Sequence, residues 1–187
     1  MKKIPTLFKR EFANHRVVAI KDEITPGCED AFLRGIATIK LDGCCCAIIG
    51  GEAYRRYDAK KGKKPPDGAI PCSDPDPVTG HWPHWVKVNP EKSDDKWFCK
   101  LMLPKLGILP DGTYEAIGVH FNGNPYNSEY DQLILHGRSV VTVERTYAGV
   151  KNWLENHDCE GLVFWLDEEP VCKIKRSDFG LPWPGKE

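Results

Sequence analysis

Short strands dominate the pattern of apolar and polar positions along this chain. Apolar runs at 36–43 and 45–50 predict two strands, Gly50-Gly51 predicts a hairpin turn, and 52–58 predicts the returning strand. A clear helical period occurs in 147–158, where apolar residues are three and four positions apart. Further strands are predicted at 97–103, 112–121, 139–145, 160–166 and 170–176.

A segment rich in proline, glycine and aspartate interrupts this pattern at about 62–96. Its seven prolines argue against a helix or a central strand, because proline lacks the N–H group that both structures use. Its tryptophans Trp82 and Trp85 argue against disorder, so we expect a functional insert. The whole pattern predicts an antiparallel α+β protein, with residues 1–187 forming a single domain that carries this insert.

Composition narrows the classes of function. The hydrophobic content of 41% and charged content of 28% are typical of a globular protein, and a net charge of −1 argues against a general attraction to nucleic acid. Neither a bilayer-spanning run nor a signal peptide is recognisable, so we expect a cytoplasmic protein without membrane partners. The run 54–64 is locally basic, which indicates either a solvated loop or a phosphate-binding patch.

The eight cysteines form no C-x-x-C pair and are expected to be reduced thiols in the absence of a secretory signal. A zinc site is an alternative for four residues, although their spacing matches no compact zinc finger. These residues are Cys72, His81, His84 and Cys99.

Charged side chains also occur inside the predicted strands. Residues two apart share a face of a strand, and burying an unpaired charge is costly, so one shared polar cleft is the economical arrangement. Neighbouring lysines lower the pKa of a third and bind phosphate, while the carboxylates are suited to Mg²⁺, so the set predicts phosphoryl or nucleotidyl transfer. The alternative is ordinary charge pairing across a sheet. The residues are Lys40, Asp42, Glu115, Glu160, Lys173 and Lys175.

Four short motifs contain most of these residues. In chain order they are "KLDG" (40–43), "TYEAIG" (113–118), "CEGLVFW" (159–165) and "CKIKR" (172–176). Their order and spacing resemble the covalent nucleotidyltransferases, which include polynucleotide ligases and mRNA-capping guanylyltransferases. Together with "YRRYDAKKGKKPPDGAIPC" and "PDPVTGHWPHWVKV", they make residues 35–180 more closely similar to the ATP-dependent 5′-to-3′ RNA ligase family.

That resemblance implies a ligase-type nucleotidyltransferase (adenylation) domain, in which antiparallel sheets flank a nucleotide cleft and no C-terminal OB domain follows. It implies ATP and Mg²⁺ or Mn²⁺ as cofactors, with AMP carried covalently on Lys40. It also implies RNA with 5′-phosphate and 3′-hydroxyl ends as the substrate, RNA repair as the role, and no obligate protein partner. The expected location is the cytoplasm, or the host cytoplasm for a viral or phage protein.

The resemblance also implies roles for individual residues. Lys40, Lys173 and Lys175 are catalytic: the first takes AMP from ATP, and the other two hold the α-phosphate. Glu160 binds the metal, and Glu115 contacts the ribose or the metal. The implied nucleotide-binding set is Ile39, Lys40, Asp42, Arg55, Arg56, Glu115, Phe121, Val163, Lys173 and Lys175.

Three members of this set have more specific expected contacts. Arg56 fits the family pattern better than Arg55 as a contact to the ribose or the RNA 5′-phosphate. Val163 is expected to pack on the adenine, and Phe121 is a candidate to stack on its other face.

Two departures from related enzymes matter. Cys45 occupies the position where DNA ligases and capping enzymes usually have an arginine, which favours the RNA ligase family. The chain ends eleven residues after Arg176, too few for the C-terminal OB domain of capping enzymes and many DNA ligases. That domain often supplies a motif that orients pyrophosphate, so self-adenylylation is the step that the sequence supports least. Two alternatives therefore stay open: a capping-type guanylyltransferase, and a non-catalytic module that binds RNA or zinc.

Overall fold

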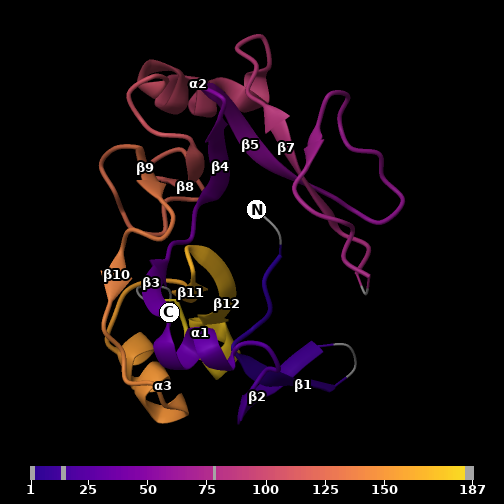
Figure 1. Ribbon diagram of the computed structural model, residues 1–187. Helices are drawn as coiled ribbons and strands as arrows, with labels where there is room; N and C mark the ends of the chain where they lie inside the picture. Colours follow the sequence, from indigo (N-terminus) through magenta and orange to yellow (C-terminus); the bar gives the residue numbers. More distant parts are fainter. Residues whose placement is uncertain (1–2, 14–15, 78, 184–187) are drawn as a thin grey trace. The chain divides into compact units, whose positions relative to one another are not determined.

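The computed structural model describes residues 3–13, 16–77 and 79–183, and the chain divides into two compact units (Figure 1). The six-stranded unit consists of Asp42–His136 together with Lys3, and the four-stranded unit consists of 4–41 and 137–183.

The six-stranded unit is built on one antiparallel sheet with the strand order β6-β7-β5-β4-β8-β9. The predicted hairpin at its centre is confirmed: Gly50 and Gly51 have φ values of 58° and 74°, which glycine adopts readily. Its elements are β4 (Cys44–Ile49), β5 (Glu52–Ala59), β6 (Ile70–Pro71), β7 (Trp82–Lys87), η1 (Ser93–Asp95), α2 (Lys96–Met102), η2 (Leu103–Lys105), β8 (Gly112–Ile117) and β9 (Gln132–Leu135).

The two faces of this sheet pack differently because successive side chains of a strand point to opposite sides. On β4, Cys46 and Ile48 belong to a large core that also contains Met102 of α2. Cys45 and Ala47 point to the other face, whose apolar cluster is small. The second face therefore has room for polar side chains.

Two predictions in this unit were wrong. Residues 97–103 were predicted as a strand, but 96–102 form the helix α2, because the apolar residues of this short run repeat at helical as well as strand spacing. The insert does contain an interior strand, β7, which lies between β5 and β6. Pro83 is accommodated near its start, where the Pro83 carbonyl accepts a hydrogen bond from the N–H of Cys72 at 2.9 Å.

The four-stranded unit contains an antiparallel sheet with the strand order β10-β3-β11-β12 and a separate antiparallel hairpin of β1 and β2. Thr146 caps the predicted helix α3, since its hydroxyl accepts a hydrogen bond from the N–H of Gly149 at 2.9 Å. The elements are β1 (Phe8–Ala13), β2 (Arg16–Ile24), α1 (Glu29–Arg34), β3 (Ile36–Lys40), β10 (Val140–Val141), α3 (Tyr147–Glu155), β11 (Gly161–Leu166), β12 (Glu169–Lys175) and η3 (Arg176–Phe179).

One face of this second sheet forms a hydrophobic core with residues of α1 and α3. Leu162, Phe164 and Ile174 are completely buried there. The outer edge of β12 is covered by the N-terminal segment: the N–H of Lys173 donates to the Pro5 carbonyl at 3.0 Å, and its own carbonyl accepts from the N–H of Leu7 at 2.7 Å. The strand that carries Lys173 is thus hydrogen-bonded on both sides.

These elements confirm the prediction of an α+β protein with antiparallel sheets and few helices. That residues 1–187 act as a single domain stays a prediction. None of the helices in the described part of the chain is long and apolar enough to cross a membrane.

Candidate active site

Three adjacent strands of the four-stranded unit bring charged residues together at one end of the sheet. Gly161 of β11 pairs with Lys40 of β3 on one side and with Lys175 of β12 on the other. Glu160 directly precedes Gly161, and Lys173 shares its strand face with Lys175. We call Lys40, Glu160, Lys173 and Lys175 the lysine cluster.

Glu160 is the centre of this cluster. One of its carboxylate oxygens pairs with the Lys40 ammonium and the other with the Lys175 ammonium, and only 14% of its side chain is exposed. Burial opposes ionisation of Glu160, but the attraction of the two lysines outweighs it, so its pKa lies below the ordinary value. A single ionised carboxylate therefore bridges two ammonium groups.

Lys173 forms no ion pair with the residues that the structure describes. Burial, assisted by the positive charges of Lys175 and Lys40, lowers its pKa from 10.5 to about 8. When Lys173 is protonated, the cluster holds three ammonium groups and one carboxylate. This excess of positive charge favours binding of an anion such as a phosphate group.

Gly161 allows the three strands to approach closely. A Cβ atom at this position would lie 2.0 Å from the carbonyl oxygen of Ile174, so no side chain fits without moving the strand. The glycine after Glu160 thus keeps Lys40 and Lys175 in adjacent positions of the sheet.

The residues beside the lysine cluster divide between the two faces of the sheet. Val163 pairs with Thr38 and Lys173, and it lies on the same face as the lysines. The indole N–H of Trp165 donates to the Thr38 hydroxyl at 2.8 Å on this face. Ile39 instead packs against the hydrophobic core, so only its backbone is available to a nucleotide on the lysine face.

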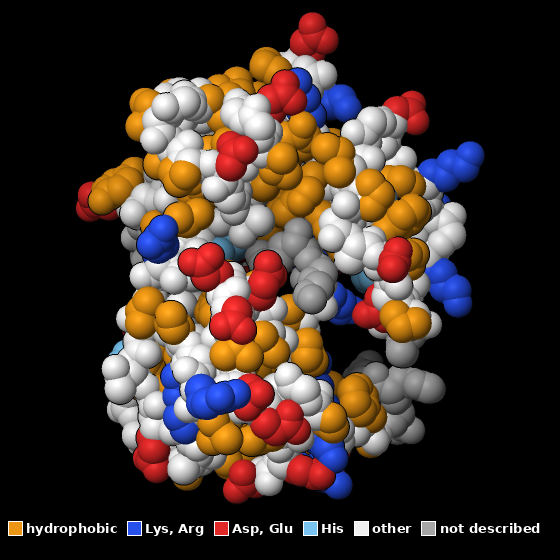
Figure 2. Space-filling model, viewed as in Figure 1, with side chains coloured by type: hydrophobic (Ala, Val, Ile, Leu, Met, Phe, Trp, Pro, Cys, Tyr) orange, Lys and Arg blue, Asp and Glu red, His pale blue; other side chains and the backbone are white. Residues whose placement is uncertain are grey.

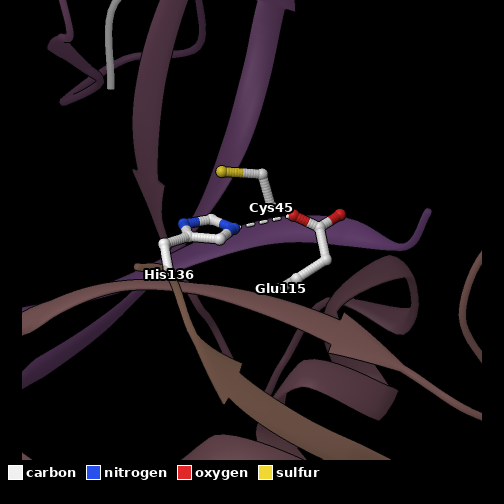
Figure 3. A group of neighbouring side chains, drawn as sticks. All are labelled: Cys45, Glu115 and His136. Atoms are coloured by element: carbon white, nitrogen blue, oxygen red, sulfur yellow. Dashed lines mark hydrogen bonds and ion pairs between the residues drawn. The ribbon is translucent and has the colours of Figure 1, made fainter. Parts of the chain in front are cut away.

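In the six-stranded unit, Glu115 is held by two groups of its own unit, and Cys45 lies beside it. One carboxylate oxygen accepts a hydrogen bond from the N–H of Gly43 at 3.1 Å, and the other lies 3.0 Å from Nε2 of His136. Figure 3 shows the thiol of Cys45 beside this carboxylate–imidazole pair. Cys45, Glu115 and His136, here called the Cys–Glu–His cluster, have potential ligand atoms that all lie within 4.8 Å of one another.

His136 was not recognised from the sequence. It lies one residue beyond β9, where Gln132, Ile134 and His136 alternate with two leucines. This alternation was the available signal, because it places the histidine on the face that carries Glu115, the partner of Ile134.

The two arginines of β5 lie on opposite faces of the sheet. Arg55 forms an ion pair with Asp95, which is completely buried and also accepts a hydrogen bond from the N–H of Asn89 at 2.9 Å. Arg56 shares its face with Cys45 and is close enough to favour the thiolate of that cysteine. Arg55 is therefore engaged inside the unit, whereas Arg56 is on the face of Glu115.

Phe121 and Asp42 complete the predicted set. Phe121 is only 1% exposed and packs edge-on against Phe98 in the core, with 5.2 Å between ring centroids. Its ring is therefore not available to stack on an adenine, and we withdraw that assignment. Asp42 follows the strand of Lys40 by two positions, and its N–H donates to the hydroxyl of Tyr126 at 2.7 Å.

The four residues considered for zinc are not brought together among the described residues, where the Cys–Glu–His cluster is the group with suitable geometry. In Figure 2 the Lys and Arg side chains of the described residues lie interspersed with Asp and Glu side chains. The basic loop residues Lys60, Lys61, Lys63 and Lys64 are exposed.

Comparison with known proteins finds relatives that share one name, at low sequence identity. The chain is 24% identical to RNA ligase 1 of Rattus norvegicus over an alignment that covers 94% of this chain and 77% of the relative. It is 25% identical to RNA ligase 1 of Mus musculus, with 94% and 76% covered. No family model matches the chain. The similarity to these relatives confirms that the sequence is close to the RNA ligase family.

Proposed function

We propose that this chain is an ATP-dependent RNA ligase that works through a covalent lysyl-AMP intermediate on Lys40, within a ligase-type nucleotidyltransferase fold. The observation that carries the proposal is the lysine cluster, in which Lys40 lies beside one carboxylate and two further lysines on one sheet face. The similarity to proteins named RNA ligase 1 supports the same reaction class and an RNA substrate.

The first step forms a bond between Nζ of Lys40 and the α-phosphorus of ATP. The ammonium first loses a proton to solvent, and the bond from the phosphorus to pyrophosphate breaks as the new bond forms. Lys173 and Lys175 face the same side and stabilise the charge on the phosphate oxygens in the transition state. Their fixed positions on β12 also orient the phosphate for attack.

The donor set of the cluster is compatible with Mg²⁺. A magnesium ion is commonly held by one or two carboxylates together with substrate phosphates and water, and Glu160 is the carboxylate of this cluster. When bound, the ion supplies neutralisation of charge on the departing pyrophosphate. In our proposal the phosphate of ATP takes over Lys175, and Lys40 stops pairing with Glu160 once it has lost its proton. These two changes release the carboxylate.

Two further transfers complete the joining of RNA. An oxygen of the RNA 5′-phosphate attacks the phosphorus of AMP, and Lys40 leaves as an amine. The RNA 3′-hydroxyl then attacks the 5′-phosphorus and loses its proton to solvent. The bond from this phosphorus to the oxygen that bridges to AMP breaks, AMP leaves with that oxygen, and a 3′–5′ phosphodiester remains. In this scheme Arg56, Glu115 and Asp42 contact the nucleotide or RNA, and Val163 packs on the adenine, as the resemblance implies. The reaction is proposed for RNA repair in the cytoplasm.

The proposal is tested by joining of 5′-phosphorylated RNA in the presence of ATP and Mg²⁺. We expect ATP but not GTP to support joining. Lys40→Ala should lose joining of phosphorylated RNA but still seal RNA that was adenylylated in advance, because the last step does not use the lysine as a nucleophile. Labelling by GTP would instead indicate a capping-type guanylyltransferase, and RNA binding without joining would indicate a non-catalytic module.

A further inference from the structure

The Cys–Glu–His cluster is assembled by neighbouring strands of a single sheet. Cys45 on β4 pairs directly with Glu115 on β8, and β9 continues from the other side of β8 to His136. The backbone N–H of His136 also donates to the Thr113 carbonyl at 3.0 Å, so the ladder extends to the histidine. The three side chains are therefore fixed on one face by the sheet itself.

Groups outside the cluster already fix the orientation of two of its members. Nδ1 of His136 lies 2.9 Å from the hydroxyl of Thr113, and one oxygen of Glu115 accepts from the N–H of Gly43. This leaves Nε2 of His136 and the second oxygen of Glu115 facing each other, with Sγ of Cys45 in reach (Figure 3). Protein ligands of metals are commonly oriented in this way by hydrogen bonds to their outer atoms.

We propose that Cys45, Glu115 and His136 bind a divalent transition-metal ion of the zinc class. One sulfur, one nitrogen and one oxygen donor suit Zn²⁺ or Co²⁺, whereas Mg²⁺ prefers oxygen ligands alone. Three protein ligands leave a fourth position of a tetrahedral ion for water or a substrate group. The negative charges of the thiolate and the carboxylate balance the charge of the ion. The positive charge of Arg56, on the neighbouring strand, repels the ion and so lowers the affinity of the site.

Binding of the ion requires loss of the Cys45 proton. Burial, with a smaller contribution from Glu115, raises the pKa of this thiol to about 12. The ion binds the thiolate, so binding releases this proton. The site goes beyond the proposed ligase function, because nucleotide transfer does not require a zinc-class ion at Glu115.

The test is a Co²⁺ titration of the full chain, purified without a histidine tag and in the absence of ATP and RNA. We expect one ion per chain and a near-ultraviolet thiolate-to-cobalt absorption band that Zn²⁺ abolishes and excess Mg²⁺ does not. Cys45→Ser should remove the band. Cys44→Ser, on the same strand but the opposite face, should keep it. Thr113→Val should weaken affinity by roughly 10–100-fold, the range for loss of an outer hydrogen bond.

Absence of the band in the wild-type protein would overturn the proposal, whatever the variants do. So would a band that survives Cys45→Ser or disappears equally in Cys44→Ser, with folding of each variant checked by circular dichroism. In those cases His136 would serve only to orient Glu115 through their hydrogen bond. Because no nucleotide is present, a failure here is distinct from a failure of the ligase proposal.

Discussion

Lys173 should destabilise the folded protein, so its replacement by methionine should stabilise it. The pKa of this lysine is lowered from 10.5 to about 8, mainly by burial. Since one pKa unit corresponds to ~1.4 kcal/mol, keeping Lys173 charged in the folded state costs about 3 kcal/mol relative to the unfolded chain. Methionine keeps most of the aliphatic length without the charge. Lys173→Met should therefore raise the free energy of unfolding at pH 7 by up to about 3 kcal/mol.

The sign of the pH dependence follows from the same shift. Below pH 8 both states hold the proton and the full cost is present. Above pH 8 the folded state loses the proton, while the unfolded state keeps it up to a pKa of 10.5, so wild-type stability rises with pH in this window. Between pH 7 and about pH 9.5, the wild type should gain roughly 2 kcal/mol relative to Lys173→Met.

Urea unfolding at both pH values, followed by tryptophan fluorescence, measures these differences. Lys151→Met is a suitable control, because Lys151 is only half-buried on α3 of the same unit and pairs with Glu155 on the surface. It should change stability by less than about 0.5 kcal/mol at either pH. A Lys173→Met protein less stable than the wild type at pH 7, or one that shows the same pH dependence, would refute the reasoning. The stabilised variant should also fail to form the AMP adduct, as expected for a lysine that serves function at a cost in stability.

Three further substitutions test other parts of the account. Glu160→Gln leaves Lys40 and Lys175 without a counter-charge and should lower the rate of AMP-adduct formation at least ~100-fold, measured by intact mass over time; an unchanged rate would remove Glu160 from the site. Gly161→Ala forces a methyl group against the backbone of β12 and should cost about 1–3 kcal/mol in urea unfolding while also slowing adduct formation. If Gly161→Ala had wild-type stability and a wild-type rate of adduct formation, the close approach of the strands would not be needed for either. Thr146→Ala removes the cap of α3 and should cost about 1 kcal/mol with no effect on the adduct rate; a slower rate would link the helix to the site.

The central hairpin and the strands that carry the lysines were predictable from the sequence. Turn glycines and strand alternation define 45–58, and two-residue spacing places Lys173 and Lys175 on one face. The helix at 96–102 was not predictable in this way, because the apolar residues of so short a segment fit either period. The strand β7 was missed because its proline argued against it, although a proline near a strand start is tolerated.

The candidate site was partly predictable for a related reason. The charged residues inside predicted strands pointed to Lys40, Glu160, Lys173 and Lys175. That Glu160 pairs with two of these lysines depends on how the strands pair, which the sequence does not reveal. The burial of Phe121 could not be foreseen, since it depends on packing against α2, a helix that was predicted as a strand.

The proposed function depends on covalent attachment of AMP to Lys40. The most direct measurement is peptide mapping by mass spectrometry after incubation of the protein with ATP and Mg²⁺. We predict one AMP per chain, located on the peptide that contains Lys40 and absent from the Lys40→Ala variant. AMP attached to another residue, or an adduct that persists in the variant, would contradict the account.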